Sequence, residues 1–303
     1  MRRLIVLLTA LAAALVAAPG AGSPASAMTQ PGPLAQPGSV TAAAPPKVTK
    51  LLVVVEENHS LASMRAGMPY TFGLAQRYGY ATDYHALRHP SLPNYVAITG
   101  GAMYGIYDDQ DPSAHPIIRQ SVFGQAVRHG KTAATYVESM PTACALTSSG
   151  RYAVRHNPWT YFVNNRVSCR AHDKPMSSFV TDVRVGRLPR VGMVVPNVCH
   201  DAHDCSLGTA DAWFKQQMAL VFAGSDWRSG HLAVVLTADE DDHTAGNVVL
   251  TTVIHPSQHH RVVGTRLTHY SLTRLYDEVA GLPYLHNAAT APSMAKAFGL
   301  PVG

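Results

Sequence analysis

Short apolar runs, often rich in β-branched residues, alternate along this chain with longer stretches of helical periodicity. The apolar runs predict strands at 51–55, 132–136, 191–195, 232–236 and 248–254. Such continuously apolar strands are typical of a parallel sheet that is buried on both faces. The amphipathic stretches predict helices at 71–78, 121–128, 209–222 and 271–280. The alternation predicts an α/β fold, with a doubly wound, mainly parallel sheet and helices on both of its faces.

A further helix is expected to begin at Ser91, shortly after a strand-like run at 80–85. Serine is a favoured N-cap residue, and Pro93 suits the first turn, where a missing N–H costs nothing. The free N–H groups and the dipole of a helix N-terminus favour a phosphate. Asn94 is expected to direct its side-chain amide at the same anion. Taken by itself, the motif is also explained by a serine that only caps a helix.

The first 46 residues differ in character from the rest. Residues 1–27 combine two arginines, an apolar core and an Ala-Ser-Ala site, a pattern typical of a secretory signal peptide. Residues 28–46 are rich in Pro, Ala and Gly and carry no charge, which predicts a flexible tether. Residues 47–303 have the size of one large folded domain. We therefore expect a secreted protein with no integral membrane segment once the signal is cleaved.

The charge balance says little about partners. Loss of residues 1–27 would leave 22 basic and 19 acidic residues, a net charge of +3. The basic residues are scattered, so the pattern predicts no nucleic-acid partner and only a slight attraction for anionic substrates.

All four cysteines lie in the predicted domain, and four cysteines allow three pairings. Their local grouping favours two short loops, each closed by a disulfide in an oxidising compartment: Cys144–Cys169 and Cys199–Cys205. A zinc site is the alternative for the second pair, which encloses two histidines. Its spacing matches no common structural zinc pattern.

Acidic residues gather just after three predicted strands. Eight of the 19 acidic residues fall in the segments 56–59, 196–204 and 239–243. Because ligands bind beyond the carboxyl ends of such strands, we expect these segments to meet Ser91 on one rim of the sheet. Crowded carboxylates raise one another's pKa unless a cation neutralises them. Each segment alone is better explained by a solvated loop or a set of helix caps, but together they predict a cage for Mg²⁺, Ca²⁺ or Mn²⁺, made by Glu57, Asn58, Asp239, Glu240 and Ser91.

Such a cation would lower the pKa of a serine hydroxyl and polarise a phosphoryl oxygen, the chemistry that a hydrolase of phosphate esters needs. Among the 16 histidines, His203 and His269 adjoin a strand end or a helix start on the presumed rim. An imidazole there could bind phosphate or protonate the leaving group. His89 and His156 are further candidates.

Six segments, taken together, resemble the bacterial secreted phosphoesterases of the alkaline phosphatase superfamily, the group of acid phosphatases and phospholipases C. In family order, they are 54–60, 89–95, 155–159, 201–204, 237–242 and 269–272. The resemblance implies an alkaline phosphatase-like fold, with residues 47–303 as the catalytic domain. It implies that Ser91 is the nucleophile, that Asn94 is a catalytic asparagine, and that the cage residues bind metal.

The resemblance also implies that His203 and His269 contact the phosphate or the leaving group. The same segments supply the expected substrate-binding residues His89, His156, Asp201 and Asp204. Because two-zinc alkaline phosphatases carry Asp-His where this chain has Asp239-Glu240, the resemblance implies one hard divalent cation rather than two zinc ions.

The expected function is a secreted, metal-assisted phosphomonoesterase of acid phosphatase type that works through a phosphoserine. Phosphoinositides, and so lipid-linked phosphate esters, are among the expected substrates. The alternatives are a phosphodiesterase or phospholipase C that uses the same site, and a non-catalytic exported binding protein.

Overall fold

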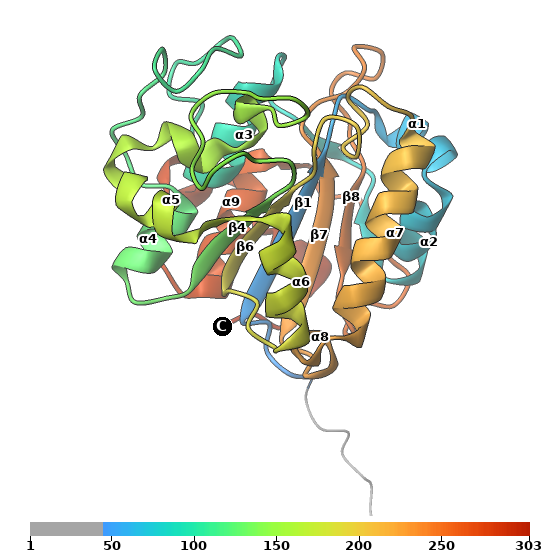
Figure 1. The fold of residues 1–303 in the computed structure, drawn as a ribbon. Helices are drawn as coiled ribbons and strands as arrows, with labels where there is room; N and C mark the ends of the chain where they lie inside the picture. The colour runs from blue at the N-terminus through green and yellow to red at the C-terminus, as the bar shows by residue number, and fades with distance from the viewer. Residues whose placement is uncertain (1–44) are drawn as a thin grey trace, which may run out of the picture. The chain divides into compact units, whose positions relative to one another are not determined.

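A central sheet of eight strands organises residues 45–303, the part of the chain that this computed structural model describes (Figure 1). The expected signal segment 1–27, and residues 28–44 of the expected tether, lie outside the described residues. The strand order is β5-β4-β6-β1-β7-β8-β2-β9, and β3 and β10 form a separate small sheet. The strands span β1 Lys50–Glu56, β2 Gly79–Ala81, β3 Tyr84–His85, β4 Ala133–Val137, β5 Asp173–Pro175, β6 Val191–Val195, β7 Leu232–Ala238, β8 Thr251–Ile254, β9 Arg261–Val263 and β10 Leu267–Thr268.

The sheet is mainly parallel, as the sequence predicts. Strand β1 lies between β6 and β7 and is parallel to both, with Leu51 paired to Val191 on one side and Ala233 on the other. In the described part of the sheet only β8 runs the other way, antiparallel to β7 and β2. The carboxyl ends of β1, β4, β6 and β7 therefore meet at one rim.

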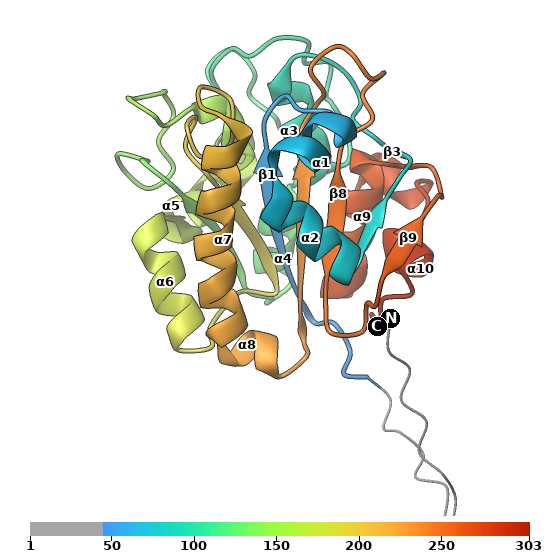
Figure 2. The same cartoon turned by 90° about the vertical axis from the view of Figure 1, so that its right-hand side faces the viewer.

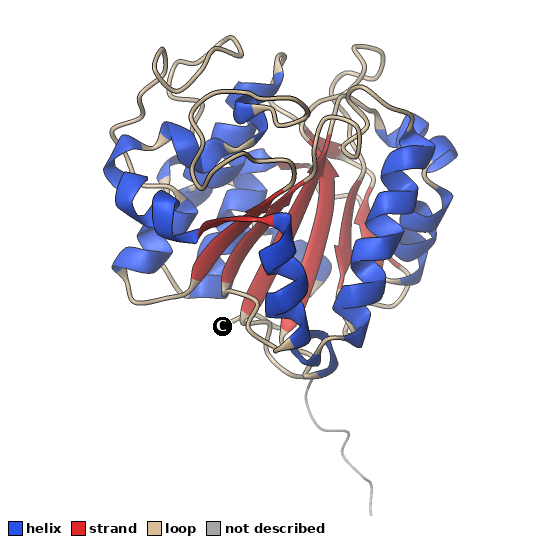
Figure 3. Cartoon of the chain, viewed as in Figure 1, coloured by secondary structure: helices blue, strands red, loops and turns tan. Residues whose placement is uncertain are grey.

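Helices cover both faces of the sheet (Figures 2 and 3). Helices α2, α6 and α7 pack together on one face, while α3, α4 and α9 pack together on the other. The helices span α1 Leu61–Gly67, α2 Pro69–Arg77, α3 Ser91–Gly100, α4 Val122–Arg128, α5 Arg166–His172, α6 Met176–Arg184, α7 Leu207–Ala223, α8 Ser225–Arg228, α9 His269–Ala280 and α10 Met294–Phe298. Four short 3₁₀ helices span η1 Val154–His156, η2 Pro158–Tyr161, η3 Val163–Asn165 and η4 His286–Ala289.

The core follows from the apolar strands. Six of the seven residues of β1 are buried, and all residues of β4, β6, β7 and β8 are. Each fully buried Val or Leu side chain contributes about 1.5–3 kcal/mol to stability. The Tyr276 hydroxyl of α9 donates to the backbone oxygen of Gly192 at 2.8 Å, which ties this helix to the sheet. The acidic segments therefore follow strands whose positions are fixed by the packed core.

Most expected boundaries agree with the structure within about two residues, and three elements differ in ways that matter for the fold. The predicted strand at 248–254 is shorter, because β8 begins at Thr251. The run at 80–85 divides between two sheets, since β2 pairs with β8 and β9 whereas β3 pairs with β10. Helix α9 begins two residues before Ser271, which is its third residue and completes a capping box with Thr268.

Both predicted disulfides are present, Cys144–Cys169 with a Cα–Cα distance of 5.5 Å and Cys199–Cys205 with 4.7 Å. The second pair is therefore not available as a zinc site. Within residues 45–303, no helix combines the length and apolar character needed to cross a bilayer. At the edge opposite the acidic rim, Val48 and Val302 form a parallel β-bridge, which brings the two ends of the described domain together.

Candidate active site at the carboxyl rim

Ser91 is the first residue of α3, and Pro90 occupies the N-cap position. The prediction that Ser91 caps the helix is therefore wrong. Its hydroxyl does not accept a bond from the helix backbone but donates one to Glu57 Oε2 at 2.9 Å. The backbone N–H of Leu92 is instead satisfied by Asp109 Oδ1 at 2.8 Å. The Ser91 hydroxyl is thus released from capping and faces the acidic end of β1.

All ten residues of α3 are buried, which fixes the position of Ser91. Leu92 and Val96 pack into a small apolar cluster with Ile106, Ile117, Tyr161 and Phe162. The Thr273 hydroxyl of α9 donates to the backbone oxygen of Ala97 at 2.7 Å and joins the two helices. Gly101 ends α3 in the left-handed region, at φ 74°, which a glycine adopts without strain.

Glu57, directly after β1, is fully buried. The Tyr95 hydroxyl donates to its Oε1, Ser91 donates to its Oε2, and His156 Nε2 lies 3.3 Å from the same Oε2. Burial, together with the charges of Asp239 and Asp201, raises the pKa of Glu57 well above its usual range. A carboxylate held this way is ionised at neutral pH only if positive charge is placed beside it.

Asp239 follows β7 and lies beside the end of β1. The backbone N–H of Asn58 donates to Asp239 Oδ1 at 3.1 Å, and the N–H of Asp239 donates to the backbone oxygen of Glu56 at 3.0 Å. Burial raises the pKa of Asp239 to about 7. Asp239 Oδ2 and Asn58 Oδ1 are buried and have no hydrogen-bond partner. Buried oxygens without a hydrogen-bond partner need a compensating group.

Glu240 continues the same loop. Its Oε2 accepts from Asn94 Nδ2 at 3.2 Å, and its Oε1 lies 3.1 Å from His89 Nδ1. Burial, and then the charges of Asp239 and Asp109, raises the pKa of Glu240 to about 9. The acidic loop is therefore crowded with carboxyls that the protein alone does not neutralise.

These oxygens fit a hard divalent cation. The predicted ligands come from the ends of two adjacent parallel strands, β1 and β7, and Ser91 approaches them from α3. Their donor atoms are carboxylate and amide oxygens, the set that Mg²⁺, Ca²⁺ and Mn²⁺ prefer. The unpartnered Asp239 Oδ2 and Asn58 Oδ1 are available to such an ion.

The Asn94 amide is not directed at an incoming anion, contrary to the prediction. Its Oδ1 accepts from the backbone N–H groups of Leu87 and Arg88 at 3.0 and 3.3 Å. Its Nδ2 donates to the backbone oxygen of Arg88 at 2.7 Å and also reaches Pro90 and Glu240. Asn94 therefore braces the chain that leads into Ser91 and connects it to the acidic loop.

His156 and Asp201, expected to bind substrate, lie beneath the rim. Both are fully buried. His156 Nδ1 lies 3.1 Å from Asp201 Oδ2, while its Nε2 faces Glu57. Burial, with help from Arg155 and His203, lowers the pKa of His156 well below its usual range. Glu57, His156 and Asp201 each offer a ligand atom within 4.8 Å of the others and so form a group able to hold a metal, whereas among residues 45–303 Glu57, Asp239 and Glu240 do not form such a group.

The His203 side chain is partly accessible, at 30% exposed. Its Nδ1 lies 2.7 Å from Asp204 Oδ1, and its Nε2 lies 3.0 Å from a guanidinium nitrogen of Arg155. Asp204 is itself 59% exposed and contacts His203 rather than the acidic loop. The structure thus places Asp204 where it orients a histidine.

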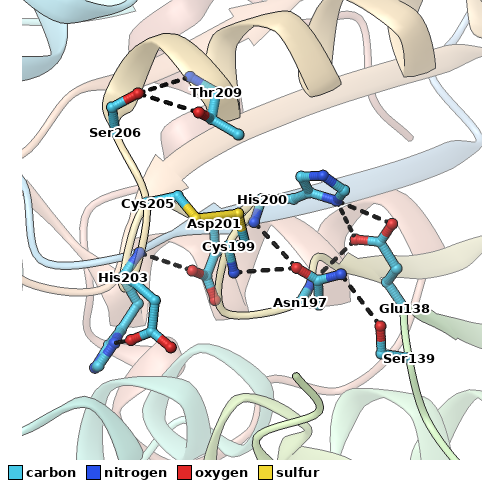
Figure 4. Close-up of a disulfide and its surroundings, with 11 residues drawn as sticks. Glu138, Ser139, Asn197, Cys199, His200, Asp201, His203, Cys205, Ser206 and Thr209 are labelled. Carbon is cyan, nitrogen blue, oxygen red and sulfur yellow. Dashed lines mark hydrogen bonds and ion pairs between the residues drawn. A yellow bond between two sulfur atoms is a disulfide. The ribbon is translucent and has the colours of Figure 1, made fainter. Parts of the chain in front are cut away.

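The Cys199–Cys205 disulfide closes the loop that carries Asp201 and His203 (Figure 4). Asn197 Oδ1 accepts from the N–H groups of Cys199 and His200 at 3.0 and 3.1 Å. His200 Nδ1 lies 2.8 Å from Glu138 Oε2, at the end of β4. The disulfide, the hydrogen bonds to Asn197 and the contact between His200 and Glu138 together restrain this loop.

His269 is placed differently from the expectation. It is fully buried, its Nδ1 lies 3.1 Å from the Tyr84 hydroxyl, and its Nε2 lies 2.6 Å from the backbone oxygen of Asp239. Burial lowers its pKa to about 4, so the ring is neutral. Both ring nitrogens of His269 already have partners within the protein. This arrangement favours a role in positioning Asp239 over a role in protonating the leaving group.

His89 contacts the acidic loop from the other side. Its Nε2 lies 3.2 Å from Asp241 Oδ1, and its ring stacks on His243 with centroids 3.8 Å apart. Beside this pair is a pocket of about 610 Å³, lined in part by His85, Arg266 and Asn247. His89 thus lies between the predicted metal ligands and an open cavity.

Comparison with known proteins agrees with this geometry. The model of the phosphoesterase family matches residues 62–275. The chain belongs to the phosphoesterase family. It is accordingly a hydrolase that acts on phosphate esters.

The curated relatives carry phosphatase names. The chain is 27% identical over 264 residues to a phosphatidylinositol-3-phosphatase of Mycobacterium tuberculosis, and the match covers 86% of each protein. It is 29% identical over 220 residues to a phosphate-repressible acid phosphatase of Penicillium chrysogenum, which covers 67% of this chain and 52% of that protein. The chain therefore spans about half the length of this acid phosphatase.

Solved structures support the fold. A protein of the alkaline phosphatase superfamily from Vibrio parahaemolyticus superposes with a TM-score of 0.58 at 12% identity, covering 84% of this chain and 72% of that one. Murine ectonucleotide pyrophosphatase/phosphodiesterase 5 superposes with a TM-score of 0.53 at 10% identity, covering 84% and 100%. The predicted alkaline phosphatase-like α/β fold is confirmed.

The sequence alone did not indicate three residues of this phosphoesterase site. Tyr95 bonds to Glu57 from one turn beyond Ser91, at a spacing that a helical projection of α3 could have revealed. Arg155 lies in one of the segments that carry the family resemblance. Asp109 belongs to a segment without helix or strand and had no sequence signal at all.

Proposed function

We propose that this phosphoesterase is an exported, metal-assisted phosphomonoesterase that uses Ser91 as its nucleophile. The observation that carries the proposal is the Ser91 hydroxyl, released from helix capping and bonded to Glu57. The buried oxygens Asp239 Oδ2 and Asn58 Oδ1, without partners, support the metal part of the proposal. The disulfides support export, because such bonds persist in oxidising compartments.

The residues proposed to hold the cation are Glu57, Asn58, Asp239 and Glu240. When bound, a divalent cation supplies positive charge that lowers the pKa of a nearby hydroxyl and polarises a phosphoryl oxygen. Glu57 accepts the hydrogen bond of the Ser91 hydroxyl, which fixes the position of Oγ. Tyr95 holds the other oxygen of Glu57, which keeps this carboxyl in one orientation.

In the proposed reaction, Ser91 Oγ attacks phosphorus while the bond from phosphorus to the leaving oxygen breaks. The product is a phosphoserine, the Ser91 proton passes to Glu57, which accepts its hydrogen bond, and the leaving oxygen takes up one proton from a second group. His203 is the proposed donor of this second proton, because it is partly exposed and Asp204 orients its ring. Water then attacks the phosphoserine and gives one proton back to His203, inorganic phosphate departs, and Ser91 regains its proton from Glu57.

The pocket of about 610 Å³ beside His89 and His243 is proposed to receive the leaving group. Arg266, His89 and His243 supply positive or proton-donating groups to it, which suits a polar or anionic alcohol. A phosphorylated inositol, free or lipid-linked, has this character. The similarity to a phosphatidylinositol-3-phosphatase supports the same class of substrate.

A substrate panel tests the proposal. Purified protein would be assayed on p-nitrophenyl phosphate, on phosphatidylinositol 3-phosphate in vesicles, and on the diester bis(p-nitrophenyl) phosphate, before and after chelation with EDTA. We expect rapid release of phosphate from the two monoesters, slow cleavage of the diester, and loss of activity on chelation that Mg²⁺, Ca²⁺ or Mn²⁺ restores. Preferential cleavage of the diester would show a phosphodiesterase, and no turnover of any ester would contradict an enzyme.

A further inference from the structure

We propose that the Asp109 carboxylate occupies the position that the substrate phosphate takes, so that Asp109 competes with substrate for the active site. This inference rests on the proposed function, because it concerns the same nucleophile. It adds a residue that lowers the affinity of the resting enzyme for phosphate.

The first observation is the bond from Leu92. The first N–H groups of a helix have no partner within the helix and attract anions. In α3, the Leu92 N–H points to Asp109 Oδ1 at 2.8 Å. Leu92 directly follows Ser91, so a phosphorus atom within reach of Ser91 Oγ brings phosphoryl oxygens close to this N–H. A carboxylate oxygen already lies there.

The second observation is Arg155. Its Nε lies 3.8 Å from Asp109 Oδ2, and one of its terminal nitrogens lies 3.0 Å from His203 Nε2. A guanidinium forms short, paired hydrogen bonds with phosphate. At 3.8 Å, Asp109 attracts Arg155 but does not form such bonds. The guanidinium of Arg155 therefore keeps hydrogen-bond donors that a larger anion with more oxygens could use.

The third observation is the charge around the site. Asp109 adds a negative charge to those of Asp239 and Glu240, two of the residues proposed to hold the cation. Asp239 Oδ2, fully buried and without a partner, lies in the same acidic group. A metal ion there and Arg155 would flank Ser91 with positive charge. That arrangement favours one anion at the site, either the Asp109 carboxylate or the phosphate.

Asp109 can leave without disturbing α3. Its side chain is 34% exposed, and residues 102–115 form neither helix nor strand. Ser91, by contrast, belongs to a helix in which every residue is buried, so its backbone is held in place. Displacement of Asp109 therefore moves a loop residue and leaves the nucleophile in place.

The test compares Asp109→Asn with Asp108→Asn. An asparagine at 109 retains an oxygen that can accept from Leu92 but removes the competing charge. Asp108 lies on the same loop and removes the same charge when replaced, yet it contacts Gln110 and His115 instead of Leu92. The measurements are KM for p-nitrophenyl phosphate and the inhibition constant of inorganic phosphate, at fixed metal concentration and pH.

We expect Asp109→Asn to lower both constants roughly tenfold, because a hydrogen bond to a charged group is worth about 1.5–3 kcal/mol and a tenfold change corresponds to about 1.4 kcal/mol. Asp108→Asn should match the wild type. Arg155→Gln should raise both constants, while the exposed Arg184, at the end of α6, provides the control Arg184→Gln. Unchanged or higher constants for Asp109→Asn would overturn the inference and leave Asp109 as a helix cap.

The two proposals fail separately. A wild-type protein that hydrolyses no monoester would overturn the proposed function. Calorimetric titration of metal-loaded wild type and Asp109→Asn with inorganic phosphate would still decide the inference. Tighter phosphate binding by the variant supports the competition, and equal or weaker binding overturns it.

Discussion

The Ser91 hydroxyl donates a 2.9 Å hydrogen bond to Glu57 and so joins the start of α3 to the end of β1. Because Ser91 is not the N-cap, Ser91→Ala keeps the cap at Pro90 and replaces the first helical residue by a good helix former. We expect the loss of this bond to cost about 1 kcal/mol of stability. Turnover should fall by at least about a thousandfold. Steady-state kinetics and a thermal melt would check both, and near wild-type turnover would exclude Ser91 as the nucleophile.

Replacement of the proposed metal ligands should act on metal binding and activity together. Glu57→Gln and Asp239→Asn should each abolish activity and lower metal occupancy. The double variant should be scarcely worse than either single one, because the two residues act as a unit. Added metal should no longer raise the melting temperature, since only binding to the native state produces that shift. Elemental analysis and thermal melts with and without metal would measure these effects.

Asp242→Asn is the matched control for the metal ligands. Asp242 lies on the same loop, but its side chain bonds to Thr244 at the surface. Asp241 is unsuitable as a control, because it is buried and accepts from the N–H groups of His243, Ala245 and Asn247. Similar mild losses in Asp239→Asn and Asp242→Asn, with metal content unchanged, would show that the acidic loop does not bind the cation.

The two disulfides should differ in what their removal changes. Cys144–Cys169 joins residues 25 apart, so its replacement by two serines should lower the free energy of unfolding by about 3 kcal/mol. Cys199–Cys205 joins residues only 6 apart but holds the loop of Asp201 and His203. Its removal should lower kcat/KM more than it lowers stability. Urea denaturation and kinetics on both double-serine variants would measure this, and the reverse ranking would contradict a positioning role for the shorter loop.

Asp277→Asn should stabilise the protein at neutral pH. Burial raises the pKa of Asp277 to about 7, and its Oδ1 has no hydrogen-bond partner. A raised pKa in the folded state means that Asp277 is most favourable below its unfolded pKa of about 3.9. Its contribution is lost as the pH rises through about 7. Relative to wild type, the variant should therefore gain on the order of 4 kcal/mol of stability between pH 4 and pH 8.

Urea denaturation of both proteins across this pH range would measure the difference. The remaining Oδ1 of the asparagine can still accept from Leu285, whose N–H donates to Asp277 Oδ2 at 2.9 Å in the wild type. A pH-independent difference between the two proteins would show that Asp277 is not titrating in the folded state.

The strands of the sheet and the rim of the site follow from sequence because burial on both faces leaves a continuous apolar run. Val53 and Val235, for example, are fully buried in neighbouring parallel strands, and the acidic residues after each strand therefore meet. The roles of side chains within the site are less accessible. The sequence predicts that Asn94 binds an anion. In the structure, however, its side-chain oxygen accepts hydrogen bonds from the N–H groups of Leu87 and Arg88.

Contacts between segments that lie far apart in the chain could not be predicted. Asp109 comes from a loop and Arg155 from the short helix η1, and no periodicity in the sequence indicates that the two side chains meet near the start of α3. His156 and Asp201 could be recognised as polar residues near a strand end or turn. Whether they faced solvent or the underside of Glu57 depended on how the loop after β6 packs.

The parallel bridge between Val48 and Val302 has a consequence for how the enzyme can be attached to a surface. Both ends of the described domain leave from the edge where β1 begins, whereas the proposed site lies where β1 ends. A support coupled through either end would hold the molecule with its reactive side facing the bulk solution. Immobilised enzyme of this kind should therefore reach substrates presented on a second surface, such as vesicles flowing past it.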